Sequence, residues 1–328
     1  MIELNRRKLL QAASLLPCVL PGVGRAQNPW PAQPIRFIVP FAAGGPTDIA
    51  ARLIADALST RLPQRVIVEN RSGAGAVVGT EAAAAAPKDG YTFLYTVVAH
   101  ATLRAIFARL NFDPIKDFAP VALCGVIPAV LIVSPTLRVK SVQELVSLFK
   151  ANPGKFNYGS SGVGASMHFT AELFLKTAGD LQVNHIPYRG SSAAMPDLLN
   201  GTLSMIMAVA SDAVPHVQRG QLQALAVTGE HRLPQLPEVP TFRESGMPDF
   251  EAYTWHMLMA PAGTPEAIVN KMNGEVNRVL ADPVLQKRLS DLSMEIRPDN
   301  TPASAAQWLQ QETTKWERTL RDAGVVAN

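Results

Sequence analysis

An alternation of two periodicities constrains the fold of this chain more than any other feature. Short runs rich in β-branched and aromatic residues, typical of buried strands, alternate with segments whose apolar residues recur at helical spacing. Such alternation predicts an α/β fold with largely parallel sheets. The expected strands cover residues 35–39, 66–69, 91–96, 121–124, 130–133, 156–158, 184–188, 205–210, 222–227 and 255–260.

The first strand is joined to a helix by the glycine-rich turn Phe41–Asp48. Gly44 and Gly45 allow positive φ and close approach of a ligand, and Thr47 or Asp48 can cap the helix that follows. N–H groups at a helix start have no partner within the helix, so an anion there accepts their hydrogen bonds and gains about 0.3–1 kcal/mol from the helix dipole. The turn fits a ligand-holding loop, although an ordinary strand–helix turn has the same residues.

Two further turns repeat this arrangement. Gly159–Ser166, rich in glycine and serine, lies between the strand 156–158 and an apolar helix, and Tyr188–Ser192 follows the strand 184–188. In open α/β sheets, ligands bind beyond the carboxyl ends of strands. Two α/β units facing each other would therefore bring the three turns together across a cleft, the geometry of a hinged binding protein.

The charge balance argues against a nucleic-acid or membrane-surface partner. The 328 residues are 47% hydrophobic and 17% charged, which is normal for a globular protein with room for two domains. Removing the first 26 residues takes away four of 30 basic residues and one of 27 acidic ones, which leaves 26 of each. A chain without net charge lacks the basic footprint that such partners require.

Residues 1–26 have the pattern of a secretory signal peptide. The cationic segment Asn5–Lys8 precedes an apolar run, Leu9–Leu20, and Gly24-Arg25-Ala26 supplies small residues before a cut. Arg6-Arg7 also fits a twin-arginine signal. We therefore expect export to the periplasm. Cys18 would be lost with the leader and leave Cys124 without an intrachain partner, in an apolar run typical of a buried thiol.

Motifs for catalysis, cofactors and metals are weak. Gly159–Val163 departs from the G-x-S-x-G nucleophile motif at its last position, so a hydrolase using Ser160 or Ser161 is a poorly supported alternative. Residues 73–79 are one position off a dinucleotide fingerprint. The histidines of the mature chain form no metal-binding pair. We expect no enzyme activity, no cofactor and no metal.

Longer motifs, in order along nearly the whole mature chain, resemble the substrate-binding receptors of tripartite tricarboxylate transporters, the Bug family. These motifs are 39–48 (VPFAAGGPTD), 68–75 (VENRSGAG), 89–92 (DGYT), 117–121 (DFAPV), 157–162 (NYGSSG), 185–190 (HIPYRG), 224–228 (ALAVT) and 260–265 (APAGTP).

The resemblance implies a type II, periplasmic-binding-protein-like fold, a Venus flytrap with two Rossmann-like α/β domains and a hinge. Domain 1 is expected to be discontinuous, with residues 27–127 plus 229–328, and domain 2 to contain residues 128–228. The implied function is capture of a small organic carboxylate for the membrane subunits of a tripartite transporter, by a monomer. A ligand-dependent sensor subunit for a signalling kinase is the alternative.

In that family, main-chain N–H groups, hydroxyls and water hold the carboxylate. By position, ligand contact is implied for Phe41, Ala42, Gly45, Thr47, Asp48, Ser160, Gly162, Gly164, Ala165, Ser166, Tyr188, Arg189, Gly190 and Ser191. One departure is that residues 208–212 (AVASD) replace a Phe-Asp-Asn type triplet common among relatives, which should reshape the pocket. We expect Asp48 to cap its own helix and His168 to pack within the protein, with ligand contact by His168 and by Arg189 left open.

Overall fold

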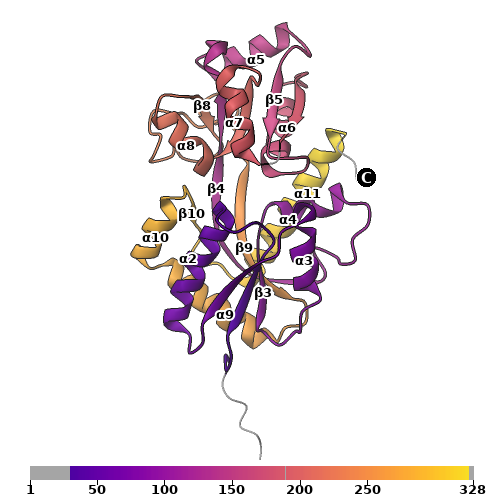
Figure 1. Ribbon diagram of the computed structural model, residues 1–328, viewed down its shortest axis with the longest axis vertical. Helices are drawn as coiled ribbons and strands as arrows, with labels where there is room; N and C mark the ends of the chain where they lie inside the picture. Colours follow the sequence, from indigo (N-terminus) through magenta and orange to yellow (C-terminus); the bar gives the residue numbers. More distant parts are fainter. Residues whose placement is uncertain (1–29, 189, 325–328) are drawn as a thin grey trace, which may run out of the picture. The chain divides into compact units, whose positions relative to one another are not determined.

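A single long strand, β4 (Phe118–Val133), carries both sheets of the protein (Figure 1). The sequence predicts two strands here, because Gly125 and Pro128 interrupt the apolar run. That prediction is wrong, since each residue lies where the strand tolerates it. Gly125 lies at a register shift, where a Cβ would approach the carbonyl oxygen of Glu295 to 2.6 Å. Pro128 lies at the end of one set of pairings, just before Ala129 starts the next.

The computed structural model describes residues 30–188 and 190–324, so the predicted signal peptide lies outside the described residues. The described residues from Pro31 onward form one compact unit. Besides β4, the elements are β1 (Ile35–Val39), α2 (Pro46–Arg61), β2 (Val66–Asn70), η1 (Ala74–Ala76), α3 (Val77–Ala84), β3 (Thr92–Val97), α4 (Ala99–Ile106), η2 (Pro135–Leu137), α5 (Val142–Ala151), β5 (Asn157–Ser160), α6 (Ser166–Thr177), β6 (Asn184–Pro187), α7 (Ser191–Asn200), β7 (Met205–Val209), α8 (Ala210–Gln218), β8 (Gln223–Val227), β9 (Tyr253–Pro261), α9 (Glu266–Leu280), α10 (Pro283–Ser290), β10 (Glu295–Ile296) and α11 (Pro302–Asp322).

The first sheet has the order β2-β1-β3-β9-β4-β10, and the second has the order β6-β5-β7-β4-β8. Among the strands of the described residues, β1 pairs in parallel with β2 and β3, and β5 pairs in parallel with β6 and β7. All pairings of β4 and β9 are antiparallel, so the sheets are mixed rather than largely parallel. The expected α/β fold is confirmed, with two α/β groups joined through β4.

Each sheet has its own hydrophobic core. The core of the first sheet includes Trp255 and Trp316, and that of the second includes Tyr158 and Phe174. Helix α11 also contacts the second group, because the ring of Trp316 lies 4.3 Å from that of Phe169 on α6. In Figure 1, α11 accordingly runs beside α4 and reaches α6.

Thr228 fixes the chain where it leaves β8 and passes back toward β9. Its N–H donates to the carbonyl oxygen of Ala129 at 2.9 Å, and its hydroxyl accepts from the Ala129 N–H at 2.9 Å. The same hydroxyl donates to the carbonyl oxygen of Ala252. One buried threonine thus ties β4 to the segment that enters β9.

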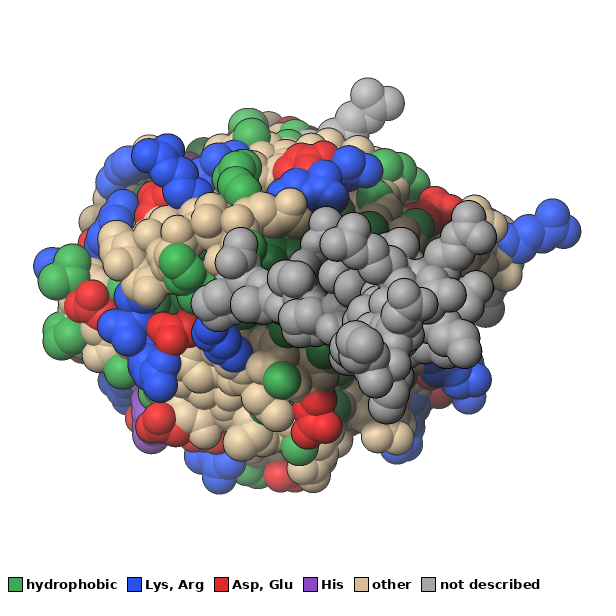
Figure 2. All heavy atoms as spheres, turned by 90° about the horizontal axis from the view of Figure 1, so that it is seen from below, with side chains coloured by type: hydrophobic (Ala, Val, Ile, Leu, Met, Phe, Trp, Pro, Cys, Tyr) green, Lys and Arg blue, Asp and Glu red, His purple; other side chains and the backbone are tan. Residues whose placement is uncertain are grey.

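Basic and acidic side chains are interspersed on the face shown in Figure 2, where the described surface is visible. This mixture agrees with the near-zero net charge expected after the leader. None of the helices among the described residues combines the length and the apolar character needed to cross a membrane.

Candidate functional site

A cavity of about 330 Å³ lies where turns from both sheets meet. The turns after β1 and β3 border it together with β9, and so do the turns after β5, β6 and β7 of the second sheet. Its lining residues are Phe41, Ala42, Gly45, Pro46, Thr47, Val97, Val98, Ala99, Ile127, Ser161, Ala165, Ser166, Gly190, Ser191, Val209, Asp212, Thr254 and His256. The three turns singled out in the sequence therefore share one cavity.

Five helices begin at this cavity, and the N-cap residue of every one of them lines it. These helices are α2, α4, α6, α7 and α8, with N-caps Gly45, Val98, Ala165, Gly190 and Val209. No side chain among the described residues caps any of the five. Their first-turn N–H groups and positive dipole ends are thus directed to one small volume.

Helices that begin elsewhere show the contrast. Ser141 caps α5, Asp282 caps α10 and Thr301 caps α11, each by a side-chain oxygen that accepts a main-chain N–H. Helices α3 and α9 also start without a side-chain cap, so a missing cap alone does not mark the site. What marks it is the convergence of five uncapped helix ends on one cavity.

Several hydroxyl groups add donors to this set of N–H groups. Thr47, Ser161, Ser166 and Thr254 line the cavity. Within the described residues, their hydroxyls have no hydrogen-bond partner from the protein. A carboxylate accepts several hydrogen bonds, and those to a charged group contribute about 1.5–3 kcal/mol each. The cavity can therefore hold an anion with neutral donors.

Asp48 holds the first turn in shape instead of capping its helix. Its Oδ2 accepts from the N–H of Gly44 at 2.8 Å and from Arg52 Nε at 3.0 Å, and its Oδ1 accepts from Asn70 Nδ2 at 2.9 Å. The N-cap of α2 is Gly45, so the expectation that Thr47 or Asp48 caps this helix is wrong. Burial opposes ionisation of Asp48, but the hydrogen bonds from Arg52, Gly44 and Asn70 hold its pKa below the ordinary value.

Ser160 faces away from the cavity into a stack of aromatic rings. Its Oγ lies 2.7 Å from His185 Nε2, and the His185 ring stacks on His168 at 4.0 Å and on Tyr158 at 4.8 Å. Burial lowers the pKa of His185 to about 4 and that of His168 to about 3, so both rings are neutral at pH 7. Ser160 has 0% exposure, which denies a substrate carbonyl access to its hydroxyl.

His168 packs in the interior, in agreement with the sequence-based preference for a packing role. Its Nδ1 accepts from the N–H of Gly164 at 3.0 Å, which fixes the turn before α6. The Tyr158 hydroxyl donates to Glu172 at the far side of the stack. The pKa of Glu172 is raised because burial outweighs that hydrogen bond. This cluster supports the serine-rich turn from beneath.

Of the predicted contact residues, Phe41, Ala42, Gly45, Thr47, Ala165, Ser166, Gly190 and Ser191 line the cavity. The remaining described ones do not. Gly162 and Gly164 shape the turn with φ of 134° and 74°, and Tyr188 donates from its hydroxyl to Asp197 Oδ2 at 2.6 Å. Asp48 and Ser160 support the loops as described above, and Arg189 lies outside the described residues.

Val209 and Asp212 belong to the segment 208–212 that the sequence predicted to reshape the pocket, and both line it. Val97, Val98 and Ala99 were missed, although they lie at and just after the end of β3, where the rule that ligands bind beyond strand ends could have found them. Thr254 and His256 lie in the first half of β9 and carry no comparable local signal. Burial lowers the pKa of His256 to about 3, and its Nδ1 lies 3.1 Å from the Tyr95 hydroxyl, so this ring is neutral.

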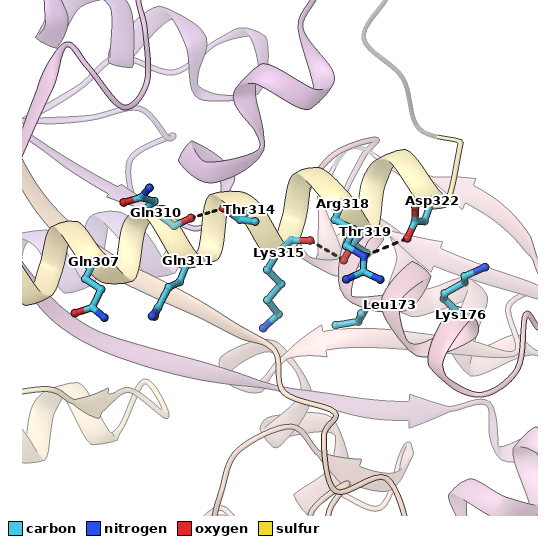
Figure 3. Close-up of a pocket in the computed structure, with 10 residues that line it drawn as sticks. All are labelled: Leu173, Lys176, Gln307, Gln310, Gln311, Thr314, Lys315, Arg318, Thr319 and Asp322. Carbon is cyan, nitrogen blue, oxygen red and sulfur yellow. Dashed lines mark hydrogen bonds and ion pairs between the residues drawn. The ribbon is translucent and has the colours of Figure 1, made fainter.

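A larger hollow of about 850 Å³ runs along α11 and the end of α6 (Figure 3). Its ionic groups are satisfied by neighbours. Arg318 lies 3.8 Å from Asp322, Lys176 Nζ donates to Asp180 at 2.6 Å, and Lys315 Nζ donates to the carbonyl oxygen of Glu251 at 2.7 Å. No helix among the described residues begins in this hollow, which makes it a poorer anion site than the smaller cavity. Among the described residues there is also no group of acidic, histidine and cysteine side chains that could hold a metal ion.

Comparisons with known proteins agree with this geometry. Residues 50–325 match the family model described as tripartite tricarboxylate transporter family receptor. The structure of the periplasmic binding protein BugD is 32% identical, with a TM-score of 0.78, and the match covers 91% of this chain and 100% of that one. Rpa4515 of Rhodopseudomonas palustris, solved with adipate, is 33% identical with a TM-score of 0.79 over 91% and 100%. MatC of the same organism, solved with bound malate, is 33% identical with a TM-score of 0.77 over 89% and 100%.

Proposed function

Because this chain belongs to the tripartite tricarboxylate transporter receptor family, we propose that it is a solute receptor which captures a small organic carboxylate in the cavity described above. The family resemblance predicted from the sequence is thereby confirmed. The observation that carries the proposal is the convergence of five helix N-termini without side-chain caps on one cavity of about 330 Å³.

Neutral donors are enough for this task. A few charge-assisted hydrogen bonds of about 1.5–3 kcal/mol each offset the cost of ordering a ligand and leave a micromolar affinity, roughly −8 kcal/mol. The volume lies at the lower end of ligand pockets, which are about 300–1,000 Å³, so the ligand is small. Adipate and malate, found in two relatives, are dicarboxylates of this size class and head the panel of candidates.

The ligand acts by joining donors from both sheets. Thr47 and Ser166 both line the cavity, Thr47 at the start of α2 after β1 of the first sheet and Ser166 at the start of α6 after β5 of the second. A ligand bound to both lowers the free energy only of the conformation in which both turns face it. We propose that this drives closure of two domains, 27–127 plus 229–328 and 128–228, about the β4 and Thr228 connections.

We propose that it delivers the ligand to membrane subunits of a tripartite transporter, a partner that the match to the receptor family supports. We propose that the receptor works as a periplasmic, non-catalytic monomer exported by its leader, and BugD, described as a periplasmic binding protein, supports this location. The buried position of Ser160 argues against this residue as a nucleophile. Ser161 lines the cavity, but among the described residues no histidine is hydrogen-bonded to its hydroxyl as a general base, which argues against the hydrolase alternative.

The test is a calorimetric and thermal-shift screen of the purified mature chain with malate, adipate and succinate, against their diamides. Carboxylates are expected to bind and diamides to fail, since only the former carry the charge that helix N-termini favour. A ligand at a hundred times its Kd should stabilise the protein by about 2.7 kcal/mol. Equal binding of diamides and diacids would refute the proposal.

Two substitutions test the cavity itself. Thr47→Ala and Ser166→Ala each remove a hydroxyl donor and should weaken binding about tenfold or more. Thr60→Ala and Thr177→Ala are matched controls on the same two helices, where each hydroxyl donates to a main-chain carbonyl away from the cavity. An effect of the controls as large as that of Thr47→Ala and Ser166→Ala would contradict the assignment.

A further inference from the structure

One acidic side chain lines the cavity, whose other groups are suited to an anion. Asp212 is the only acidic residue among the described residues that line it, and no described lysine or arginine lines it. Asp212 lies in the first turn of α8, which follows β7 of the second sheet. Among the described lining residues, a ligand with negative charge alone would therefore meet a like charge and no cationic side chain.

The surroundings of Asp212 offset the cost of its negative charge only in part. The Ser191 side chain at the start of α7 donates a hydrogen bond to it, and His216, one turn further along α8, exerts a weak electrostatic attraction. No ion pair of Asp212 occurs within the described part of the chain. Burial raises its pKa, which shows that the carboxylate lacks full compensation for its lost hydration.

The rest of the cavity lining differs from Asp212 in character. Val97, Val98 and Ile127 contribute apolar surface, and hydroxyl and main-chain donors that suit a carboxylate come from the starts of α2 and α6. The described lining thus offers donors for an anion, apolar surface and, at Asp212, one acidic side chain. A cationic group bound beside this half-buried carboxylate would offset the part of its desolvation that the Ser191 hydrogen bond leaves uncompensated.

We propose that Asp212 is the specificity-determining residue of this cavity and that it selects small carboxylates which also carry a protonated amine. This inference rests on the proposed carboxylate-binding function and narrows its ligand class to zwitterions. The ammonium group donates to the Asp212 carboxylate while the ligand carboxylate accepts from the helix ends. The charges of ligand and site then balance within one small volume.

The experiment measures the affinity of the mature chain for pairs of acids that differ only in the amine: aspartate with succinate, glutamate with glutarate, and γ-aminobutyrate with butyrate. The amine-bearing member of at least one pair should bind about ten to a hundred times more tightly. Asp212→Asn should abolish that preference, and the plain acids should bind the variant as well as, or better than, they bind the wild type.

Controls separate selection from stability. Asp56→Asn removes an exposed carboxylate of α2 that lies outside the cavity and should leave the preference unchanged. The thermal midpoint of Asp212→Asn without ligand shows that the variant folds. If wild-type protein prefers the plain acids, or if Asp212→Asn weakens both members of a pair equally, the zwitterion inference is wrong while the carboxylate receptor stands. Absence of binding by every acid would overturn the proposed function and this inference with it.

Discussion

Alanine at position 164 is expected to disturb the contact between the serine-rich turn and helix α4. Gly164 has a φ of 74°, and a Cβ built there would lie 2.2 Å from Ile106 Cδ1 and 3.0 Å from its Cγ1. Ile106 ends α4 on the first-sheet side, whereas Gly164 precedes α6 on the other. Ala165 and Ser166, which line the cavity, follow directly. The substitution therefore acts where the two sides of the site meet.

Two contributions make up the stability loss expected for Gly164→Ala. Alanine in the left-handed region costs about 1–2 kcal/mol, and overpacking against Ile106 adds about 1–3 kcal/mol because its side chain must move. Gly154 provides the matched control, because its φ is 71° and nothing lies within 4 Å of the position a Cβ would take. Gly154→Ala carries only the backbone strain. The difference between the variants therefore isolates the contact.

The assay is chemical unfolding combined with ligand titration. Gly164→Ala should lose about 1–3 kcal/mol more stability than Gly154→Ala, a shift on the order of 2 °C per kcal/mol in Tm, and should bind ligand more weakly. Compared with Ile106→Ala alone, the double variant Gly164→Ala with Ile106→Ala should show recovery of most of that excess, because the overpacked side chain is gone. Equal losses in the two glycine variants, or no recovery in the double variant, would refute the reasoning.

Three other perturbations test the supporting structure. Asn300 Oδ1 accepts from the Leu123 N–H at 2.9 Å, and Asn300 Nδ2 donates to the Leu123 carbonyl oxygen at 3.0 Å. Asn300→Ala should therefore lower the free energy of unfolding by about 2–4 kcal/mol, measured in urea. A loss under ~0.5 kcal/mol would contradict this prediction. Hydrogen bonding lowers the pKa of Asp48 below 3.8 in the folded protein. The contribution of Asp48 to the free energy of unfolding is therefore complete above pH 3.8 and is lost as the pH falls through the folded-state pKa. In Asp48→Asn, the free energy of unfolding should fall less steeply as the pH is lowered. An unchanged slope would show that Asp48 is not the source of the acid loss of stability. Burial lowers the pKa of His168 from 6.5 to about 3, so stability should fall as pH drops through that interval. His168→Asn keeps an acceptor for the Gly164 N–H and should make the fall shallower, whereas an identical pH profile would exclude His168 as its source.

Local patterns predicted the elements that local hydrogen bonding creates. The first strand has the predicted limits, 35–39, and the turn after it lines the cavity. The sequence did not predict the direction in which individual side chains point. Ser160 ends β5 and Tyr188 follows β6, but they contact His185 and Asp197 instead of the cavity. Successive residues of a strand face opposite sides, so pairing register decides which of them reach a ligand.

The sequence by itself determined the strand–turn–helix units and the anion-binding character of their glycine- and serine-rich turns, because helix starts leave free N–H groups whatever the remaining chain does. Only the tertiary structure decided that five such starts share one cavity and that Asp212 and Thr254 complete it. Those positions depend on the pairing of β4 with β9 in the first sheet and with β7 in the second. The paired strands lie far apart in the sequence, and local periodicity carries no information about which strands pair.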